Sequence, residues 1–382
     1  MKNLRAELEQ RQQHQLYRSR RIVDSPQGPV ITIDGQQRLN FCSNDYLGFA
    51  NHPDIRRAFI RGIETYGNGS GAAHLVNGHS RAHHALEEEL AAFSGYPRAL
   101  LFSTGYMANL AIAQALCGRG DLVLEDRLNH ASLLDAGLLS GARLQRYQHL
   151  DTDDLSAKLA GRDRGEKLVL TDAVFSMDGD MAPLAAISKT CRENDSWLMV
   201  DDAHGIGVLG KQGRGSLSHQ LIQGTDVPIY MATLGKAFGT AGAFIAASED
   251  IIEYLIQTAR SYIYTTAMPA ALAEASREAL RQLQQDEWRR EHLGALITRF
   301  KQGAREMGIN LMPSDTAIQP IMIGDTGRAV ALSQQLFEQG ILITAIRPPT
   351  VPEGTARLRV TLSAAHSNQQ VEQLLDVLNS LI

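Results

Sequence analysis

Residues 227–239 read VPIYMATLGKAFG and place Lys236 shortly after an apolar run. The run over residues 227–231 is typical of a buried strand, and the small residues beside the lysine leave room for a flat ligand. Because desolvation disfavours the charged form of an amine, a lysine at such a strand end is easier to deprotonate. The stretch therefore indicates a lysine that attacks a carbonyl to form a Schiff base. The lysine of an isolated TxGK pattern is more often a solvated surface residue. Other parts of the sequence are therefore needed to distinguish the two interpretations.

Seven short apolar segments, separated by helical patterns, occur between about residues 46 and 265. They are residues 99–102, 122–125, 144–147, 168–171, 198–201, 229–233 and 243–247. Near-continuous apolar segments of this length predict an α/β fold in which a mostly parallel, seven-stranded sheet is covered on both faces.

The sequence predicts three parts in the chain. Residues 1–45 form an N-terminal helical extension, which contains a strand pair joined by Asp34-Gly35 and packs with the small domain. Residues 46–268 form a large cofactor-binding domain. Residues 269–382 form a smaller C-terminal α/β domain, which opens with one long amphipathic stretch from 270 to about 308.

The composition is that of an ordinary globular protein, with 382 residues of which 44% are hydrophobic. The formal net charge of -5 provides no basic field for nucleic acid. The three cysteines lack the spacing of a metal site, so we expect reduced thiols in the cytoplasm. Since the chain has no long apolar run and no signal-like N-terminus, we expect no membrane association.

Ligands of open parallel sheets bind beyond the carboxyl ends of the strands, so the residues after each predicted strand are site candidates. Gly105 and Tyr106 lie in a strand-to-helix turn whose backbone N–H groups suit a phosphate, although a routine helix cap is the alternative interpretation. Ser176 also follows a strand and is positioned to hydrogen-bond a ligand oxygen.

Two further strand ends carry groups that suit a charged aromatic ligand. Asp201 ends a buried strand, where a carboxylate is costly without a cationic partner; a protonated ring nitrogen or a buried arginine would supply one. His204, three residues later, would reach the same ligand. His130 would stack on an aromatic ligand, although a structural loop histidine is the commoner use of such a residue.

Two other patterns are weaker indications of a site. Residues 205–210 match G-x-G-x-x-G, but the next residues are too glycine-rich to open the helix that a dinucleotide site needs. His79, His83 and His84 suggest metal ligands, yet no nearby cysteine or carboxylate arrangement completes a site. We therefore expect no metal, and we interpret these histidines as surface residues on the helix that leads to Glu87.

Six motifs, in order along nearly the whole chain, resemble the fold-type I pyridoxal-phosphate enzymes and, among them, the α-oxoamine synthases. They are NFCSNDYLG (40–48), DRLNHASLLDA (126–136), VFSMDGDMAPL (174–184), VDDAHGIGVLGKQGRG (200–215), TLGKAFG (233–239) and SYIYTTAMP (261–269). The segment TAIRPPTVPEGTARLRVTLSAAH (344–366) is similar to the branch of the family that uses L-alanine. The chain departs from the family pattern at residues 72–74, where a hydroxyl is missing, and at Asp172, where glutamate is usual.

The resemblance implies pyridoxal 5′-phosphate as the cofactor and a homodimer with shared active sites. It implies that Lys236 forms the Schiff base, that Asp201 pairs with the pyridinium nitrogen and that His130 stacks on the ring. The remaining implied contacts come from His204 and Ser176 to the phenolic oxygen, from Gly105, Tyr106 and Thr233 to the phosphate, from Thr265 to the partner's phosphate, and from Arg18, Arg347 and Thr350 to the substrates.

The implied reaction is a decarboxylative condensation of L-alanine with a pimeloyl thioester of coenzyme A or of an acyl carrier protein. Its product is a precursor of biotin, and Lys236 takes the Cα proton of alanine. Arg347 binds the amino-acid carboxylate, and Arg18 binds the far carboxylate of the acyl chain, with Arg20 and Arg21 as close neighbours. Three alternatives stay open: a related synthase that uses glycine, such as 2-amino-3-ketobutyrate ligase, a silent cofactor-binding protein, and a nicotinamide dehydrogenase.

Overall fold

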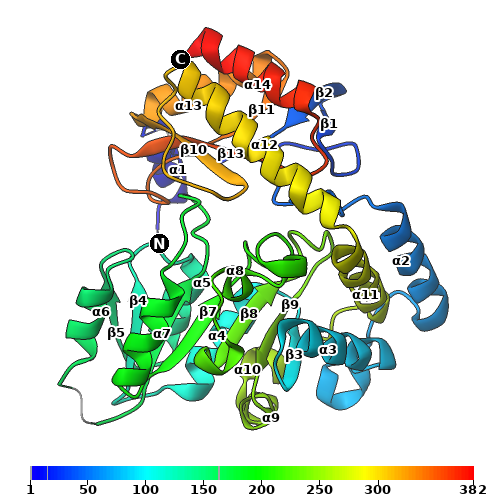
Figure 1. The fold of residues 1–382 in the computed structure, drawn as a ribbon, viewed down its shortest axis with the longest axis vertical. Helices are drawn as coiled ribbons and strands as arrows, with labels where there is room; N and C mark the ends of the chain where they lie inside the picture. Colours follow the sequence, from blue (N-terminus) through cyan, green and yellow to red (C-terminus); the bar gives the residue numbers. More distant parts are fainter. Residues whose placement is uncertain (1, 15, 162–163) are drawn as a thin grey trace. The chain divides into compact units, whose positions relative to one another are not determined.

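The computed structural model describes residues 2–14, 16–161 and 164–382, which fall into two compact units (Figure 1). We call them the sheet unit, Asn51–Ser176 with Met181–Arg290, and the terminal unit, Met1–Ala50 with Met177–Asp180 and Glu291–Ile382. The sequence placed its boundaries at 45/46 and 268/269 instead. The second boundary differs because helix α11 (Ala270–Gln285) lies in the sheet unit, where Ala271 packs on Gly62.

A seven-stranded sheet forms the centre of the sheet unit, in the order β3-β9-β8-β7-β6-β4-β5. Its strands are β3 (Arg98–Phe102), β4 (Leu122–Asp126), β5 (Arg143–Tyr147), β6 (Lys167–Asp172), β7 (Trp197–Asp201), β8 (Ile229–Thr233) and β9 (Ala243–Ala247). Only β9 runs antiparallel to its two neighbours, so the predicted mostly parallel sheet and all seven predicted strands are confirmed.

Helices cover both faces of this sheet. They are α2 (Pro53–Tyr66), α3 (Arg81–Ser94), α4 (Gly105–Leu116), α5 (Ala131–Leu139), α6 (Thr152–Leu159), α7 (Leu184–Glu193), α8 (Ser216–His219), α9 (Glu249–Thr258), α10 (Arg260–Ile263) and α11. Leu168 and Met199 share one buried cluster with Ile112 of α4. Val169 and Leu198 are equally buried, and since successive strand side chains point to opposite faces, the second face is covered as well.

The terminal unit contains two small sheets. Strands β1 (Val30–Ile33), β2 (Gln36–Asn40) and β11 (Ile341–Leu342) form the first, and β10 (Ile318–Gly324), β13 (Ala356–Thr361) and β12 (Thr344–Ile346) form the second. The parallel pairing of β2 with β11 joins the N-terminal residues to the C-terminal ones. Helices α1 (Leu4–Gln13), α13 (Thr326–Glu338) and α14 (Asn368–Leu381) complete it, with the part of α12 (Glu287–Glu306) that follows Arg290.

A buried histidine links the N- and C-terminal segments of this unit. His366 accepts a hydrogen bond from the Ser363 N–H at Nδ1 (3.0 Å), and its Nε2–H donates to the Asn40 carbonyl (3.0 Å). Both ring nitrogens are therefore used by the neutral imidazole. Burial lowers the pKa of His366 to about 4.

Three sequence expectations are decided by the backbone. The long amphipathic stretch predicted from 270 to about 308 forms two helices, because Asp286 ends α11 with a non-helical ψ of 57°. Residues 205–215 form turns and a short 3-10 segment rather than a helix, as expected for a sequence that is not a dinucleotide fingerprint. Across the described part of the chain, no helix combines the length and the apolar character that crossing a bilayer requires.

Candidate active site

The carboxyl ends of four adjacent strands surround a cavity of about 190 Å³ in the sheet unit. Pairing of β6 with β7 aligns Asp172 with Asp201, and pairing of β7 with β8 aligns Asp201 with Met231. The residues that line it are Gly105, Tyr106, Asn109, His130, Ser132, Asp172, Ser176, Asp201, Ala203, His204, Met231, Thr233 and Lys236. The structure thus brings together every predicted catalytic residue and every predicted cofactor ligand except Thr265.

One end of the cavity is built to receive an anion. Helix α4 begins there at Gly105, and the Thr104 side chain caps it by accepting a hydrogen bond from the Met107 N–H (3.2 Å). A Cβ on Gly105 would lie 2.7 Å from Thr233 Cγ2, so only glycine lets the two segments approach so closely. The Thr233 hydroxyl is buried and meets no hydrogen-bond partner within residues 2–14, 16–161 and 164–382. A phosphate oxygen would satisfy this hydroxyl together with the first N–H groups of the helix.

A hydrogen-bond network joins Asp201 to His130 through Asn109. The two N–H groups of the Asn109 amide donate to Asp201 Oδ2 (2.9 Å) and to Ser132 Oγ (2.8 Å). The Ser132 hydroxyl lies 2.7 Å from His130 Nδ1, which also accepts from the Ser132 backbone N–H (3.2 Å). Because Nδ1 accepts, the proton of the neutral imidazole sits on Nε2. The network therefore fixes the ring of His130 and the carboxylate of Asp201 together.

A second carboxylate, that of Asp172, binds the backbone N–H of the same histidine. Asp172 Oδ2 accepts from the His130 N–H at 2.7 Å, although this residue is shorter than the glutamate usual in the family. Burial, reinforced by the charge of Asp201, raises the pKa of Asp172 well above its usual range. Burial likewise lowers the pKa of His130; the charge of Asp201 opposes this effect and that of Lys236 adds to it. The charges of Asp201 and Lys236 therefore both act on His130 and on Asp172 within this site.

Lys236 reaches the cavity from a tight turn after β8. The Leu234 N–H donates to the Gly242 carbonyl (2.9 Å) and the Gly239 N–H donates to the Lys236 carbonyl (2.8 Å), which closes the turn. The side chain is half-buried among the cavity residues, as expected from the apolar strand that precedes it. Partial removal from water favours the neutral amine that a carbonyl-attacking lysine needs.

Thr265 lies outside this cavity in its own chain. Its hydroxyl donates to the Ser261 carbonyl (2.8 Å), one turn back along α10. The isolated bridge between Ala73 and Thr266 places this segment beside residues 72–76.

The predicted substrate residues line a different cavity, of about 680 Å³, in the terminal unit. Arg18, Arg347 and Thr350 are all among its walls, and an Arg347 Nη2–H donates to the Tyr17 carbonyl (2.7 Å). Of the neighbouring arginines, Arg21 also lines the cavity and its guanidinium stacks over Phe337, 3.6 Å from the ring centroid.

Sequence reasoning missed the connecting residues of the site. Asn109 lies four residues into α4 and Ser132 lies in the first turn of α5, where neither type of residue stands out. The only local signal was that an asparagine buried in a helix must find a partner for its amide.

The interpretation of the histidines near α3 as surface residues was right for His84, which is exposed on the helix, and wrong for His83. His83 is fully buried rather than on the surface: its Nε2–H donates to the Met268 carbonyl (2.7 Å) and its Nδ1 accepts from the Ser80 N–H (3.1 Å). A carboxylate is also present, because Glu87 lies close to His79 and His84. Spacing alone misled us, since helix α3 brings residues three positions apart onto one face.

Comparisons with known proteins agree with this geometry. Residues 36–378 match the family described as Aminotransferase class I and II. The chain is 62% identical to 8-amino-7-oxononanoate synthase of Thioalkalivibrio sulfidiphilus, over 99% of this chain and 97% of the relative, and 59% identical to that of Nitrosococcus oceani, over 97% and 99%.

Solved structures give the same result at lower identity. Serine palmitoyltransferase of Sphingomonas wittichii matches with a TM-score of 0.94 at 32% identity, over 99% of this chain and 96% of the other. The 8-amino-7-oxononanoate synthase of Francisella tularensis matches with a TM-score of 0.79 at 34% identity, over 90% and 97%. Since the fold, the cavity and the full-length similarity agree, the chain belongs to the aminotransferase class I and II family, with the fold of type I pyridoxal-phosphate enzymes, and within it to the 8-amino-7-oxononanoate synthases.

Proposed function

We propose that this protein joins L-alanine to a pimeloyl thioester, with loss of CO2 and release of the thiol, to make 8-amino-7-oxononanoate for biotin. The observation that carries the proposal is the cavity in which Lys236 faces the same space as His130 and Asp201, with Asn109 joining the latter two. A silent cofactor-binding protein has no need of Lys236, Asp201 and His130 together in one cavity, and a dehydrogenase would need the nucleotide helix that residues 205–215 do not form.

The cavity fits pyridoxal 5′-phosphate on two structural grounds. The buried Thr233 hydroxyl and the start of α4 at Gly105 suit the phosphate, and the buried Asp201 carboxylate suits a protonated ring nitrogen. We assign the ring face to His130 and the phenolic oxygen to Ser176 and His204. When bound, this cofactor supplies an aldehyde for amines and a ring that withdraws electrons from the amino acid's Cα.

The residues of this chain then handle the proton and the charge. Lys236 Nζ would take the proton from Cα of alanine, because it lines the same cavity as the groups that would hold the cofactor and an uncharged amine is a general base. The Asp201 carboxylate, held by Asn109 and by the Ala203 N–H (3.0 Å), would keep the ring nitrogen of a bound cofactor protonated.

Cationic residues of the terminal unit would recognise the two substrates by their carboxylates. We assign the alanine carboxylate to Arg347, whose planar guanidinium suits a bidentate contact. We assign the far carboxylate of the pimeloyl chain to Arg18 rather than to Arg20 or Arg21. Arg20 is not among the residues that line this cavity, and the guanidinium of Arg21 is stacked on Phe337.

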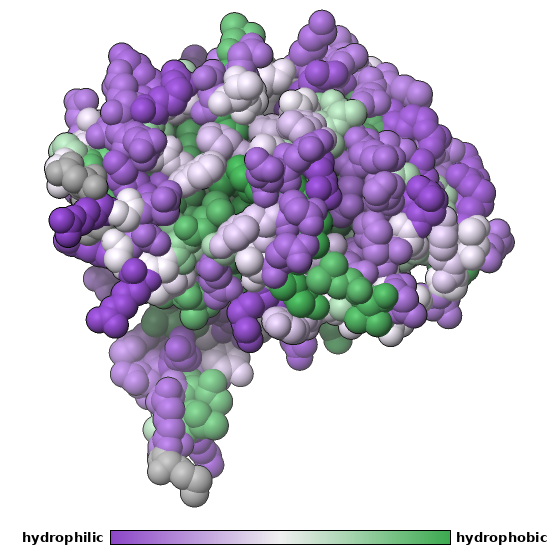
Figure 2. All heavy atoms as spheres, turned by 90° about the horizontal axis from the view of Figure 1, so that it is seen from below, coloured by the Kyte–Doolittle hydropathy of each residue, from purple (hydrophilic) through white to green (hydrophobic). Residues whose placement is uncertain are grey.

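We further propose a homodimer in the cytoplasm. Exposed hydrophobic side chains next to the Thr265 segment support the dimer: Val76 is 77% exposed and Tyr264 is 71% exposed, and the Ala267 N–H donates to the Ala72 carbonyl (3.0 Å). Figure 2 shows that hydrophobic side chains gather in groups on one face of the molecule. The three cysteines form no disulfide, which suits a reducing compartment.

The function is tested by measuring substrate choice. Purified protein loaded with cofactor is given L-alanine or glycine, and pimeloyl or octanoyl coenzyme A, and the released thiol and the condensation product are both quantified. We expect turnover with alanine and the pimeloyl thioester, and poor turnover when either is replaced. Preference for glycine would favour the related glycine-using synthase, and equal use of octanoyl coenzyme A would remove the role given to Arg18.

A further inference from the structure

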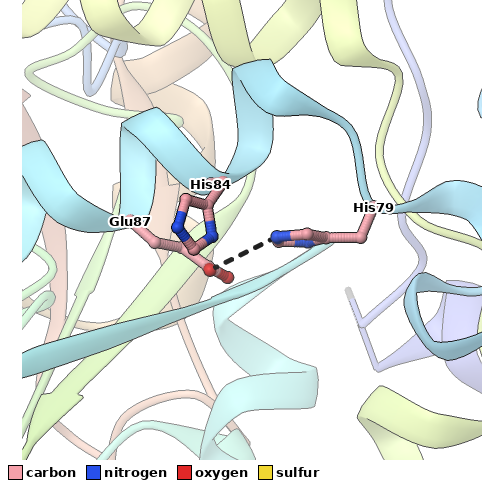
Figure 3. A group of neighbouring side chains, drawn as sticks. All are labelled: His79, His84 and Glu87. Atoms are coloured by element: carbon pink, nitrogen blue, oxygen red, sulfur yellow. Dashed lines mark ion pairs between the residues drawn. The ribbon is translucent and has the colours of Figure 1, made fainter.

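A second cavity of the sheet unit, of about 390 Å³, lies beside edge strand β3 and contains none of the residues of the proposed reaction. Three side chains in its wall point toward one another: His84 and Glu87 from helix α3, and His79 from the segment that precedes it (Figure 3). Their side chains are 51%, 13% and 29% exposed, respectively, so the group is open to small ions yet partly shielded from bulk water.

The positions of the donor atoms suit a metal ion. One donor atom from each residue lies within 4.8 Å of those of the other two, and His79 Nε2 is 3.9 Å from Glu87 Oε2. A tetrahedral ion with bonds of about 2.0–2.1 Å holds its donor atoms roughly 3.3 Å apart. Separations within 4.8 Å would therefore close by at most about 1.5 Å on binding, which requires the side chains to move; His84 is the most exposed of the three. The helix supplies two ligands because residues three apart share one face.

Neighbouring groups orient these donors in the way that metal ligands require. His74 Nδ1 lies 3.1 Å from His79 Nδ1, a distance at which one ring donates and the other accepts. When His79 is the donor, its lone pair is on Nε2, the atom nearest to Glu87. Glu87 Oε1 accepts from the Leu101 N–H (3.0 Å), which fixes the carboxylate and leaves Oε2 turned toward His79. Metal-bound histidines and carboxylates are usually held by such outer contacts.

The charged side chains around the cavity do not repel a cation. Arg98 lines the cavity, but its guanidinium pairs with Glu253 (3.3 Å), and Glu88 adds a carboxylate 3.4 Å from His84 Nε2. His83 takes no part in binding, since both of its nitrogens are used by Ser80 and Met268.

We propose that His79, His84 and Glu87 form a site for one late first-row transition-metal ion, with Zn²⁺ as the representative ligand and a fourth position open to water. Two imidazoles and one carboxylate suit Zn²⁺, whereas Mg²⁺ and Ca²⁺ prefer oxygen ligands alone. A bound ion would tie the segment that carries His79 to helix α3. This site is independent of the condensation reaction.

The test uses the full chain, without an affinity tag, loaded with cofactor and freed of metal by a chelator that is then removed. Zn²⁺ is titrated by calorimetry into the parent and into His79→Gln, His84→Gln and Glu87→Gln. His219→Gln is the matched control, because this histidine is also exposed on a helix of the same unit. Any zinc held by the cofactor is common to all five proteins, so only differences between them report on the site.

We expect one Zn²⁺ per chain in the parent and in His219→Gln. His84→Gln, which changes only an exposed side chain, should weaken binding by roughly tenfold or more, and the other two variants should do the same. Excess Mg²⁺ should not compete. The proposal is overturned if the parent binds no stoichiometric zinc, or if His84→Gln binds it as tightly as the parent. If only Glu87→Gln fails to fold, the two histidine variants decide the question.

Discussion

Replacing Asn109 by alanine should slow removal of the Cα proton from alanine while leaving the fold intact. Asn109 is buried and its amide donates to Asp201 Oδ2 (2.9 Å) and to Ser132 Oγ (2.8 Å). Asp201 would keep the Ala203 N–H donor (3.0 Å) and lose the other. Without that donor the carboxylate is a stronger proton acceptor and draws the shared proton away from the ring nitrogen, so the ring withdraws less charge from Cα.

The magnitude follows from the type of bond lost. A hydrogen bond to a charged group contributes about 1.5–3 kcal/mol. If that whole difference appears in the barrier, the rate falls by roughly 10- to 150-fold. The variant also loses the hydrogen bond from Asn109 to Ser132, which holds the His130 ring. A less firmly held ring should slow the removal of the Cα proton further. Cofactor content should change little, because Lys236, Thr233 and the start of α4 are untouched.

The assay is the exchange of the alanine Cα proton for deuterium in D2O, followed by NMR without any acyl thioester. Asn194→Ala is the control, since it removes an asparagine donor to a neutral carbonyl, Thr190 (2.9 Å), outside the cavity. Thermal unfolding of both variants separates loss of stability from loss of the network. An Asn109→Ala protein that exchanges as fast as the parent, or an Asn194→Ala protein that is slowed equally, would refute the reasoning.

Five other variants, in three separate tests, give equally definite expectations. Lys236→Ala should lose the cofactor that borohydride fixes covalently, and Lys236→Arg should not restore it because a guanidinium stays protonated; peptide mapping of the parent that finds the label on another lysine would contradict this. Arg347→Ala should raise the alanine concentration needed for half-maximal rate roughly 10- to 150-fold. Arg18→Ala should weaken binding of the pimeloyl thioester and leave that of alanine unchanged. Steady-state kinetics with each substrate varied in turn measure both effects, and an Arg347→Ala defect confined to the thioester, or an Arg18→Ala defect confined to alanine, would contradict the assignments. Because the pKa of His366 falls from 6.5 unfolded to about 4 folded, the unfolded chain takes up a proton first as pH falls, and up to about 3 kcal/mol of stability should be lost between pH 6.5 and 4. Urea unfolding across this range should show a shallower pH slope for His366→Phe than for the parent; equal slopes would exclude the assignment.

The strands and their polar ends could be predicted because their signals are local. Every strand except β5 (RLQRY) contains a short apolar run, Asp201 ends one of these strands, and His130 and Lys236 come within four residues after two others. A parallel sheet brings those ends to one edge whatever the details of the helices, so the cavity follows from the pattern.

Contacts between distant segments could not be predicted in the same way. Asn109 contacts Asp201, which is 92 positions away in the sequence, and no pattern in the residues of α4 predicts that contact. The break at Asp286 is a single non-helical residue inside a continuous amphipathic pattern. His83 and His84 are adjacent in sequence, yet the first is buried and the second exposed, because the helix turns them to different sides.

The most direct test of the whole account follows the carboxyl carbon of alanine. The purified protein, loaded with cofactor, is given L-alanine labelled with 13C at the carboxyl group together with pimeloyl coenzyme A. Released CO2 and the condensation product are then measured by mass spectrometry. We predict one labelled CO2 for each product molecule, and a product with the mass of unlabelled 8-amino-7-oxononanoate. A product that keeps the label, or thiol release without labelled CO2, would contradict the proposed condensation.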